Sequence, residues 1–164
     1  MRLTRRATLL ACLVLFPLRL GATVCEPVMP GLMLCDAQGW TLQSVEGGTA
    51  IFTSEEGITG TVTLKTGLDA EAEVWANWQQ SHAPISARAV VLDTAFVEID
   101  GRLAARSAWL PRHVDHPTVV AMTGQVGDGL ALAVTTSASA ETFDNTHRDA
   151  HERLCAALKL DRPG

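Results

Sequence analysis

The stretch Gly57-Ile58-Thr59-Gly60-Thr61-Val62-Thr63-Leu64-Lys65 shows the clearest alternation of apolar or small residues with polar residues in the chain. Successive side chains of a β-strand point to opposite faces, so this alternation predicts a strand over 58–65 with one buried face. Toward the N-terminus, residues 40–46 and 49–53 flank Gly47-Gly48. They predict two shorter strands joined by a two-glycine hairpin.

The period of the apolar pattern changes after this strand. Thr66 and Asp69 approximate a capping signal, and the apolar residues that follow recur at helical spacing. They are Leu68, Ala72, Val74, Trp75 and Trp78. The pattern predicts a helix of about 13 residues that ends near Ser81-His82. We interpret Trp75 and Trp78 as anchors of this helix on a sheet rather than as a ligand-stacking pair.

Four further strands follow, because the period returns to two. They are expected at 90–99, 102–110, 119–125 and 130–136. Asp100-Gly101 and Gly127-Asp128-Gly129 suit the hairpin turns between them, and 111–117 reads as a longer loop.

A last helix is expected from Ala140 to Leu158, with Ser139 as its N-cap, followed by a short frayed tail. Its apolar stripe also contains a histidine: Phe143, His147, Ala150, Leu154, Ala157 and Leu158.

The order β-β-β-α-β-β-β-β-α predicts an α+β fold. An antiparallel sheet of about six to seven strands would bury its apolar faces against two helices. Residues 23–164 have the length of one ordinary domain with a single core.

The N-terminus has the layout of an export signal. Arg2, Arg5 and Arg6 precede an apolar run from Ala7 to Leu18, and the small residues Gly21-Ala22 suit a cleavage site. The run is shorter than the roughly 20 residues that a membrane-spanning helix needs. We therefore expect residues 1–22 to be a signal peptide and the rest to be periplasmic or secreted.

Two other interpretations of this segment are less favoured. Thr4-Arg5-Arg6 resembles a twin-arginine signal, although Thr8 stands where an apolar residue is usual. Leu9-Leu10-Ala11-Cys12 resembles a lipoprotein box, but cleavage there would leave a short apolar segment of about five residues before it. A protein that begins near Thr23 after cleavage is the favoured interpretation.

Removal of residues 1–22 makes the chain strongly acidic. Four of the 13 Lys and Arg lie in that segment and all 18 Asp and Glu lie beyond it, which leaves nine basic residues and a formal charge of −9. Such a surface repels nucleic-acid phosphates and anionic lipids, so it disfavours nucleic-acid binding and stable membrane association.

Cysteine usage agrees with export, since Cys25, Cys35 and Cys155 remain after cleavage. Turn-forming residues between Cys25 and Cys35 favour a local disulfide. The competing pairing would join one of these two cysteines to Cys155. Either pairing leaves one thiol, which we interpret as buried and inert.

The chain resembles the PsbP-like group, which includes the bacterial DcrB-like exported proteins. The residues that carry the resemblance are Gly39-Trp40, the segment 57–62, Asp100-Gly101-Arg102 and the closing helix with Phe143, His147, Leu154 and Leu158. The resemblance implies a sheet-and-helix fold and an accessory or binding role without catalysis, with metal binding in some members. The segment 25–35 has no counterpart in that pattern.

His147, His151 and Cys155 are spaced four residues apart, so on a helix they lie along one side and could share zinc or copper. His113 and His116 could add a ligand. The alternative is that His147, which lies within the apolar stripe of the helix, is a hydrogen-bonded core residue.

Met29 and Met33 suggest a soft copper site, against which a hydrophobic strap closed by a disulfide is favoured.

Catalytic patterns are weak in this sequence. It has no glycine-flanked serine elbow and no Cys-x-x-Cys, and 124–129 lacks the lysine of a phosphate loop. Asp93 and Glu98 are separated by an odd number of positions, so they should point to opposite faces of a strand.

The sequence therefore predicts a non-enzymatic exported accessory or binding protein of the bacterial cell envelope. We expect it to have no cofactor and to bind a protein partner or small ligand. The alternative is a periplasmic metal-binding module built on the His147 and His151 pair.

Overall fold

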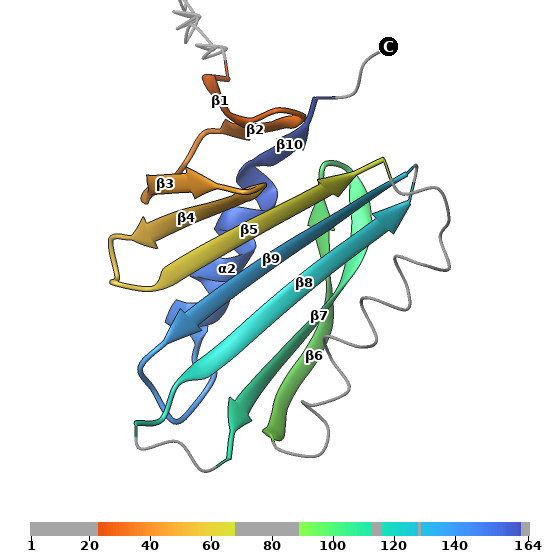
Figure 1. The fold of residues 1–164 in the computed structure, drawn as a ribbon. Helices are drawn as coiled ribbons and strands as arrows, with labels where there is room; N and C mark the ends of the chain where they lie inside the picture. The colour runs from red at the N-terminus through yellow and green to blue at the C-terminus, as the bar shows by residue number, and fades with distance from the viewer. Residues whose placement is uncertain (1–22, 68–88, 113–115, 128, 162–164) are drawn as a thin grey trace, which may run out of the picture.

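The computed structural model describes residues 23–67, 89–112, 116–127 and 129–161. Most of the strands form one antiparallel seven-stranded sheet in the order β3-β4-β5-β9-β8-β7-β6, and a helix, α2, crosses one face of it (Figure 1). The strands of this sheet are β3 (Trp40–Glu46), β4 (Thr49–Ser54), β5 (Thr59–Thr66), β6 (Ala89–Ile99), β7 (Arg102–Pro111), β8 (Val119–Gly127) and β9 (Leu130–Ala138).

The expected strands and their hairpins are confirmed, with ends that differ by one or two residues. Strand β5 has the alternating burial that its sequence predicts, and it pairs with β4 on one side and with β9 on the other. The expected helix over 66–82 lies outside the described residues, apart from Thr66, which ends β5, and Gly67. The described residues thus form a sheet-rich α+β fold with one helix.

The N-terminal and C-terminal segments form a second, three-stranded sheet in the order β1-β2-β10. It contains β1 (Cys25–Met29), β2 (Leu32–Cys35) and β10 (Leu158–Leu160). Cys25 and Cys35 are paired residues of β1 and β2 and form the predicted local disulfide. The expected frayed tail was wrong at its start, because residues 158–160 pair with β2 and Leu158 is fully buried.

The closing helix, α2 (Asn145–Ala157), begins later than predicted. Asp144, not Ser139, is its N-cap, and its carboxylate accepts a hydrogen bond of 2.8 Å from the backbone N–H of His147. The helix starts later because Phe143, which precedes it, packs in a small cluster with Ala108, Val119 and Ala121. The extended approach that buries Phe143 leaves Asp144 in the geometry of a cap.

Trp40, Gly60 and Leu154 join the sheet to α2. The indole N–H of Trp40 donates a hydrogen bond of 3.1 Å to the carbonyl oxygen of Ala150. A Cβ on Gly60 would lie 2.8 Å from Leu154 Cδ2 and 2.8 Å from Trp40 Cζ3. A glycine at the second position of β5 is therefore what lets these two side chains meet over the strand.

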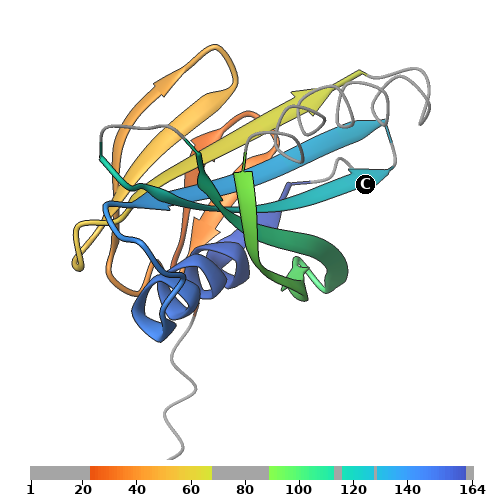
Figure 2. The same cartoon turned by 90° about the horizontal axis from the view of Figure 1, so that it is seen from below.

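The hairpin of β6 and β7 curves out of the plane of the sheet toward the side that carries α2 (Figure 2). Its turn uses Asp100 and Gly101, both with positive φ. Near the turn, Val97, Ile99 and Ala104 join the main core cluster with residues of α2. One face of the hairpin tip is thus part of the core.

We expect Gly60→Ala to lower the free energy of unfolding by about 1 to 3 kcal/mol, because the new methyl group would overpack the contact between Trp40 and Leu154. Urea unfolding followed by tryptophan fluorescence measures the loss. In a Leu154→Ala background the same substitution should cost less, since one of the two close contacts is gone. A Gly60→Ala protein as stable as the parent would contradict this account of the core.

Candidate functional site

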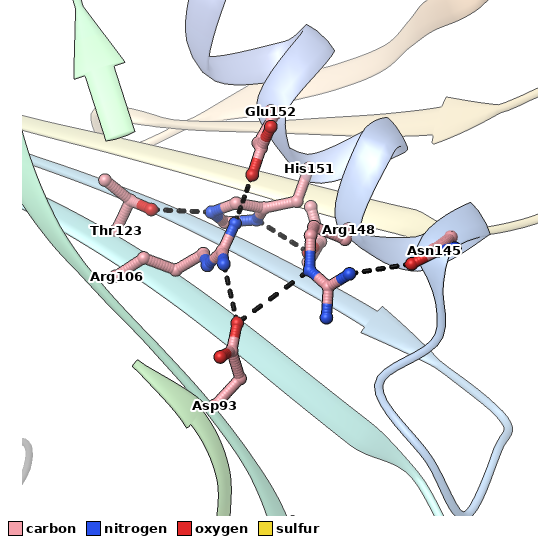
Figure 3. Close-up of polar contacts among 8 residues, drawn as sticks. Asp93, Arg106, Thr123, Asn145, Arg148, His151 and Glu152 are labelled. Carbon is pink, nitrogen blue, oxygen red and sulfur yellow. Dashed lines mark hydrogen bonds and ion pairs between the residues drawn. The ribbon is translucent and has the colours of Figure 1, made fainter. Parts of the chain in front are cut away.

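Polar side chains gather between α2 and strands β6 to β9, where an apolar core would be expected. Figure 3 shows part of this cluster, in which Thr123 contacts His151 and Arg106 contacts Asp93 and Glu152 across the interface of helix and sheet. Those that are buried are Arg106, Thr123, Thr136, His147 and His151. Buried polar groups are costly unless they find partners, so their contacts determine what the cluster can do.

The two histidines share a chain of hydrogen bonds with two threonines. His151 Nε2 lies 2.6 Å from Thr123 Oγ1, and His151 Nδ1 lies 2.8 Å from Thr136 Oγ1. Thr136 Oγ1 also lies 2.9 Å from His147 Nε2. A hydroxyl can donate one hydrogen bond and accept others, so Thr136 can satisfy one ring nitrogen of each histidine.

Both imidazoles are held in the neutral form. Burial lowers the pKa of His151 to about 3, with further contributions from the positive charge of Arg106 and from His147. Burial also lowers the pKa of His147, although Thr136 and Asp144 oppose the shift. Within the described chain, His147 Nδ1 is buried and has no hydrogen-bond partner.

Arg106 on β7 forms the charged part of the polar cluster, next to the hydrogen bonds between the histidines and threonines. Its side chain is 3% exposed, and its guanidinium pairs with Asp93 of β6 at 2.6 Å and with Glu152 of α2. Its Cζ also lies 5.3 Å from the ring centroid of Phe143, and Arg148 approaches the same ring at 5.3 Å. The guanidinium therefore ties β6, β7 and α2 together.

Cys155 is buried and forms no disulfide. Burial raises the pKa of its thiol to about 12, although Thr123 and Arg106 favour the thiolate. A thiol with this pKa stays protonated and is a poor nucleophile near neutral pH. The prediction that the leftover thiol is buried and inert agrees with this position.

The structure places His147, His151 and Cys155 on the buried side of α2. The described part of the chain contains no group of three His, Cys, Asp or Glu side chains arranged to hold a metal ion. The hydrogen bonds of the histidines to threonine match the core interpretation, and the zinc or copper hypothesis stays a prediction. His116 is exposed, and His113 lies outside the described residues.

The structure also places the two methionines suggested for a copper site and the two carboxylates considered for catalysis. Met29 is buried and Met33 is half-buried in the disulfide-closed β1–β2 hairpin. Asp93 pairs with Arg106, whereas Glu98 is exposed, so the two carboxylates lie apart as expected.

Arg106, Thr123 and Thr136 belong to the cluster but were not predicted from the sequence. Each lies on a strand at a position whose neighbours two residues away are inward-facing, such as Ala121 before Thr123 and Val134 before Thr136. Polar residues at inward positions of an alternating strand are the signal that could have found them.

A different feature lies on the outer side of the β6–β7 hairpin. Phe96 is 75% exposed and Leu103 is 73% exposed. Phe96 is paired with Ala105. Leu103 is paired with Glu98, which lies two positions after Phe96. The three side chains therefore share one face of the hairpin, which we call the hairpin apolar surface (Phe96, Leu103 and Ala105).

A cleft of about 310 Å³ adjoins this surface. It is lined by 102–105 of β7 and 124–126 of β8. We call it the β7–β8 cleft.

Several solved structures share the fold of this chain. It aligns with a protein from Bacteroides thetaiotaomicron at a TM-score of 0.57 and 11% identity, over 82% of this chain and 47% of that one. The chain thus spans about half the length of that protein. It aligns with the Ran-binding protein Mog1p of Saccharomyces cerevisiae at a TM-score of 0.57 and 7% identity, over 85% of this chain and 96% of Mog1p. These likenesses show a shared fold.

The PsbP protein CyanoP of Synechocystis also aligns, at a TM-score of 0.48 and 12% identity over 87% of this chain and 95% of CyanoP. A PsbP protein is thus among the structural neighbours, at low sequence identity. No family model matches the sequence, and no curated protein matches it.

We expect the stability of the protein to fall as the pH is lowered from 7.5 to 5. An unfolded histidine binds a proton near its ordinary pKa of 6.5, whereas folded His151 resists protonation until about pH 3. Protons therefore favour the unfolded state in this window, and His151 should account for a loss of about 2 kcal/mol by pH 5. Urea unfolding at both pH values measures it, and His147 should act in the same direction.

The matched variant is His151→Gln, which cannot bind a proton. Its free energy of unfolding should depend less steeply on pH than that of the parent. An equal pH dependence in both proteins would show that His151 is protonated in the folded state.

Proposed function

We propose that the chain is a non-enzymatic exported accessory protein that binds a protein partner through the hairpin apolar surface. The exposure of Phe96 and Leu103 carries this proposal, because large neighbouring apolar side chains on a surface mark interaction sites. Aromatic anchors of this kind contribute much of the binding energy in protein interfaces.

The interior of the molecule supports a role without catalysis. Thr123 and Thr136 hydrogen-bond to the ring nitrogens of His151, and the two terminal guanidinium nitrogens of Arg106 pair with Asp93 and Glu152. Cys155 has a raised pKa beneath the helix. These groups stabilise the position of α2 against the sheet.

Export is supported by the charge pattern of residues 1–22 and by the Cys25–Cys35 disulfide. Disulfides persist in oxidising compartments and are rare in the cytosol. Within the described residues, no helix is long and apolar enough to cross a membrane. We propose a periplasmic or secreted protein that begins after residue 22.

The structural likeness supports the general class of function. Mog1p, which has this fold, is a Ran-binding protein. A shared fold at 7% identity does not carry over a partner, so only the class of protein binding is proposed for this chain.

A photoreactive residue at position 103 tests the surface in the cells that make the protein. We expect it to crosslink to one partner protein, and the same residue at position 41, an exposed site on β3, to give no such product. Phe96→Ser should reduce the yield at position 103 severalfold, because it removes the neighbouring aromatic anchor. A crosslink only to a second copy of the chain, or equal products at both positions, would contradict the proposal.

Fractionation and intact mass measurement test the export proposal. We expect the protein outside the cytoplasm, with a mass that lacks residues 1–22 and with Cys25 and Cys35 oxidised. Full-length protein in the cytosol with all thiols reduced would contradict it.

A further inference from the structure

We infer that the partner of the hairpin apolar surface binds it through a protein segment that places a Lys or Arg side chain between apolar side chains. The inference rests on the proposed function, because it concerns the same surface. It adds the chemistry by which the partner is recognised, and Glu98 is the residue that carries it.

The first observation is the position of Glu98 within the surface. Glu98 is paired with Leu103 across the hairpin and lies two positions after Phe96 on β6. Residues that are paired across two strands, or two positions apart on one strand, point to the same side. The carboxylate of Glu98 is exposed and thus adjoins both large apolar side chains of the surface.

The second observation is that the other charges of the hairpin are engaged elsewhere. Asp93 pairs with Arg106 on the side that faces α2. Arg102 precedes Leu103 at the alternate position of β7 and lines the β7–β8 cleft. In the part of the chain that the structure describes, Glu98 forms no ion pair. Its carboxylate is therefore available to a cation of the partner.

Covering the apolar side chains removes water from the carboxylate as well. A partner that contacts Phe96 and Leu103 must lie over Glu98, because the three side chains adjoin. A carboxylate that loses water without gaining a cation or donors is costly, so a purely apolar partner is disfavoured. A Lys or Arg offsets this cost, while its apolar neighbours cover the aromatic ring and the leucine.

The same carboxylate disfavours two other occupants of this surface. A second copy that docked through the same surface would place Glu98 near Glu98 of the first copy, since a two-fold interface matches a patch with itself. An anionic lipid surface would meet this carboxylate on a chain that is strongly acidic beyond residue 22. A cationic segment of a different protein gains from both features.

Blocked peptides that share their apolar side chains test the inference on the purified protein. Each is acetyl-Leu-X-Phe-X-Leu-amide, where X is Lys, norleucine or Glu, and the backbone signals in ¹⁵N-HSQC spectra report binding. We expect only the Lys peptide, at millimolar concentration, to shift the signals of 96–98 and 103–105, because only it pairs with Glu98. Equal shifts with the norleucine or Glu peptide, or shifts of the Lys peptide confined to other strands, would overturn the inference, as would unchanged signals.

Glu98→Lys reverses the charge at an exposed position. We expect it to weaken binding of the Lys peptide about tenfold, since an attraction becomes a repulsion. Glu46→Lys, at an exposed position on β3, changes the net charge by the same amount and should leave this affinity unchanged. Equal affinities of the two variants would overturn the role of Glu98.

Glu98→Gln removes the charge with nearly the same shape, so it keeps the inference testable if the reversed charge disturbs the hairpin. We expect added salt to weaken binding of the Lys peptide less in this variant than in the parent, because salt screens the attraction that the variant lacks. The same salt dependence in both proteins would overturn the contact between Glu98 and the cation.

The crosslink at position 103 separates failure of this inference from failure of the proposed function. We expect Glu98→Lys to lower the yield of that crosslink severalfold in cells. A crosslinked partner whose yield Glu98→Lys leaves unchanged would contradict the inference alone. Binding of the Lys peptide at this surface without a crosslinked partner would contradict the proposed function alone.

Discussion

The close approach of Trp40 and Leu154 over Gly60 is the contact on which the rest of the fold depends. The indole also donates to the carbonyl of Ala150, so one side chain of the sheet fixes both the distance and the position of α2 along its axis. Side chains in a close-packed core transmit such constraints, because there is little free volume to absorb a shift. With α2 held there, Leu158 reaches β2 and closes the smaller sheet.

The buried polar cluster is the second constraint, and it acts at the other side of the helix. Arg106 links β7 to Asp93 of the edge strand and to Glu152 of α2. Such contacts add little net stability, since burying charge costs free energy that the ion pairs only offset. They nevertheless disfavour other positions of the helix, because each would leave a guanidinium or an imidazole buried without partners.

Curvature of the β6–β7 hairpin connects these constraints to the proposed binding site. The inner face of its tip packs against the core through Val97, Ile99 and Ala104. The ladder between β7 and β8 ends at Ala105 and Gly124, where the cleft begins. The outer face carries Phe96 and Leu103. One bend thus buries one face of the hairpin and leaves Phe96 and Leu103 exposed on the other face.

The sequence by itself determined the alternating strands and their glycine turns, because these depend on neighbours within a few residues. It favoured the local pairing of Cys25 with Cys35, and the structure decided it over a bond to Cys155. It also indicated that His147 lies on the buried side of a helix. Only the tertiary structure decided that Asp144 caps α2, that residues 158–160 join β2, and that Arg106, Thr123 and Thr136 meet the histidines. The open end of the β7–β8 ladder belongs to the same group. These features arise between segments far apart in the chain, and the periodicity of one segment carries no information about which partner it meets.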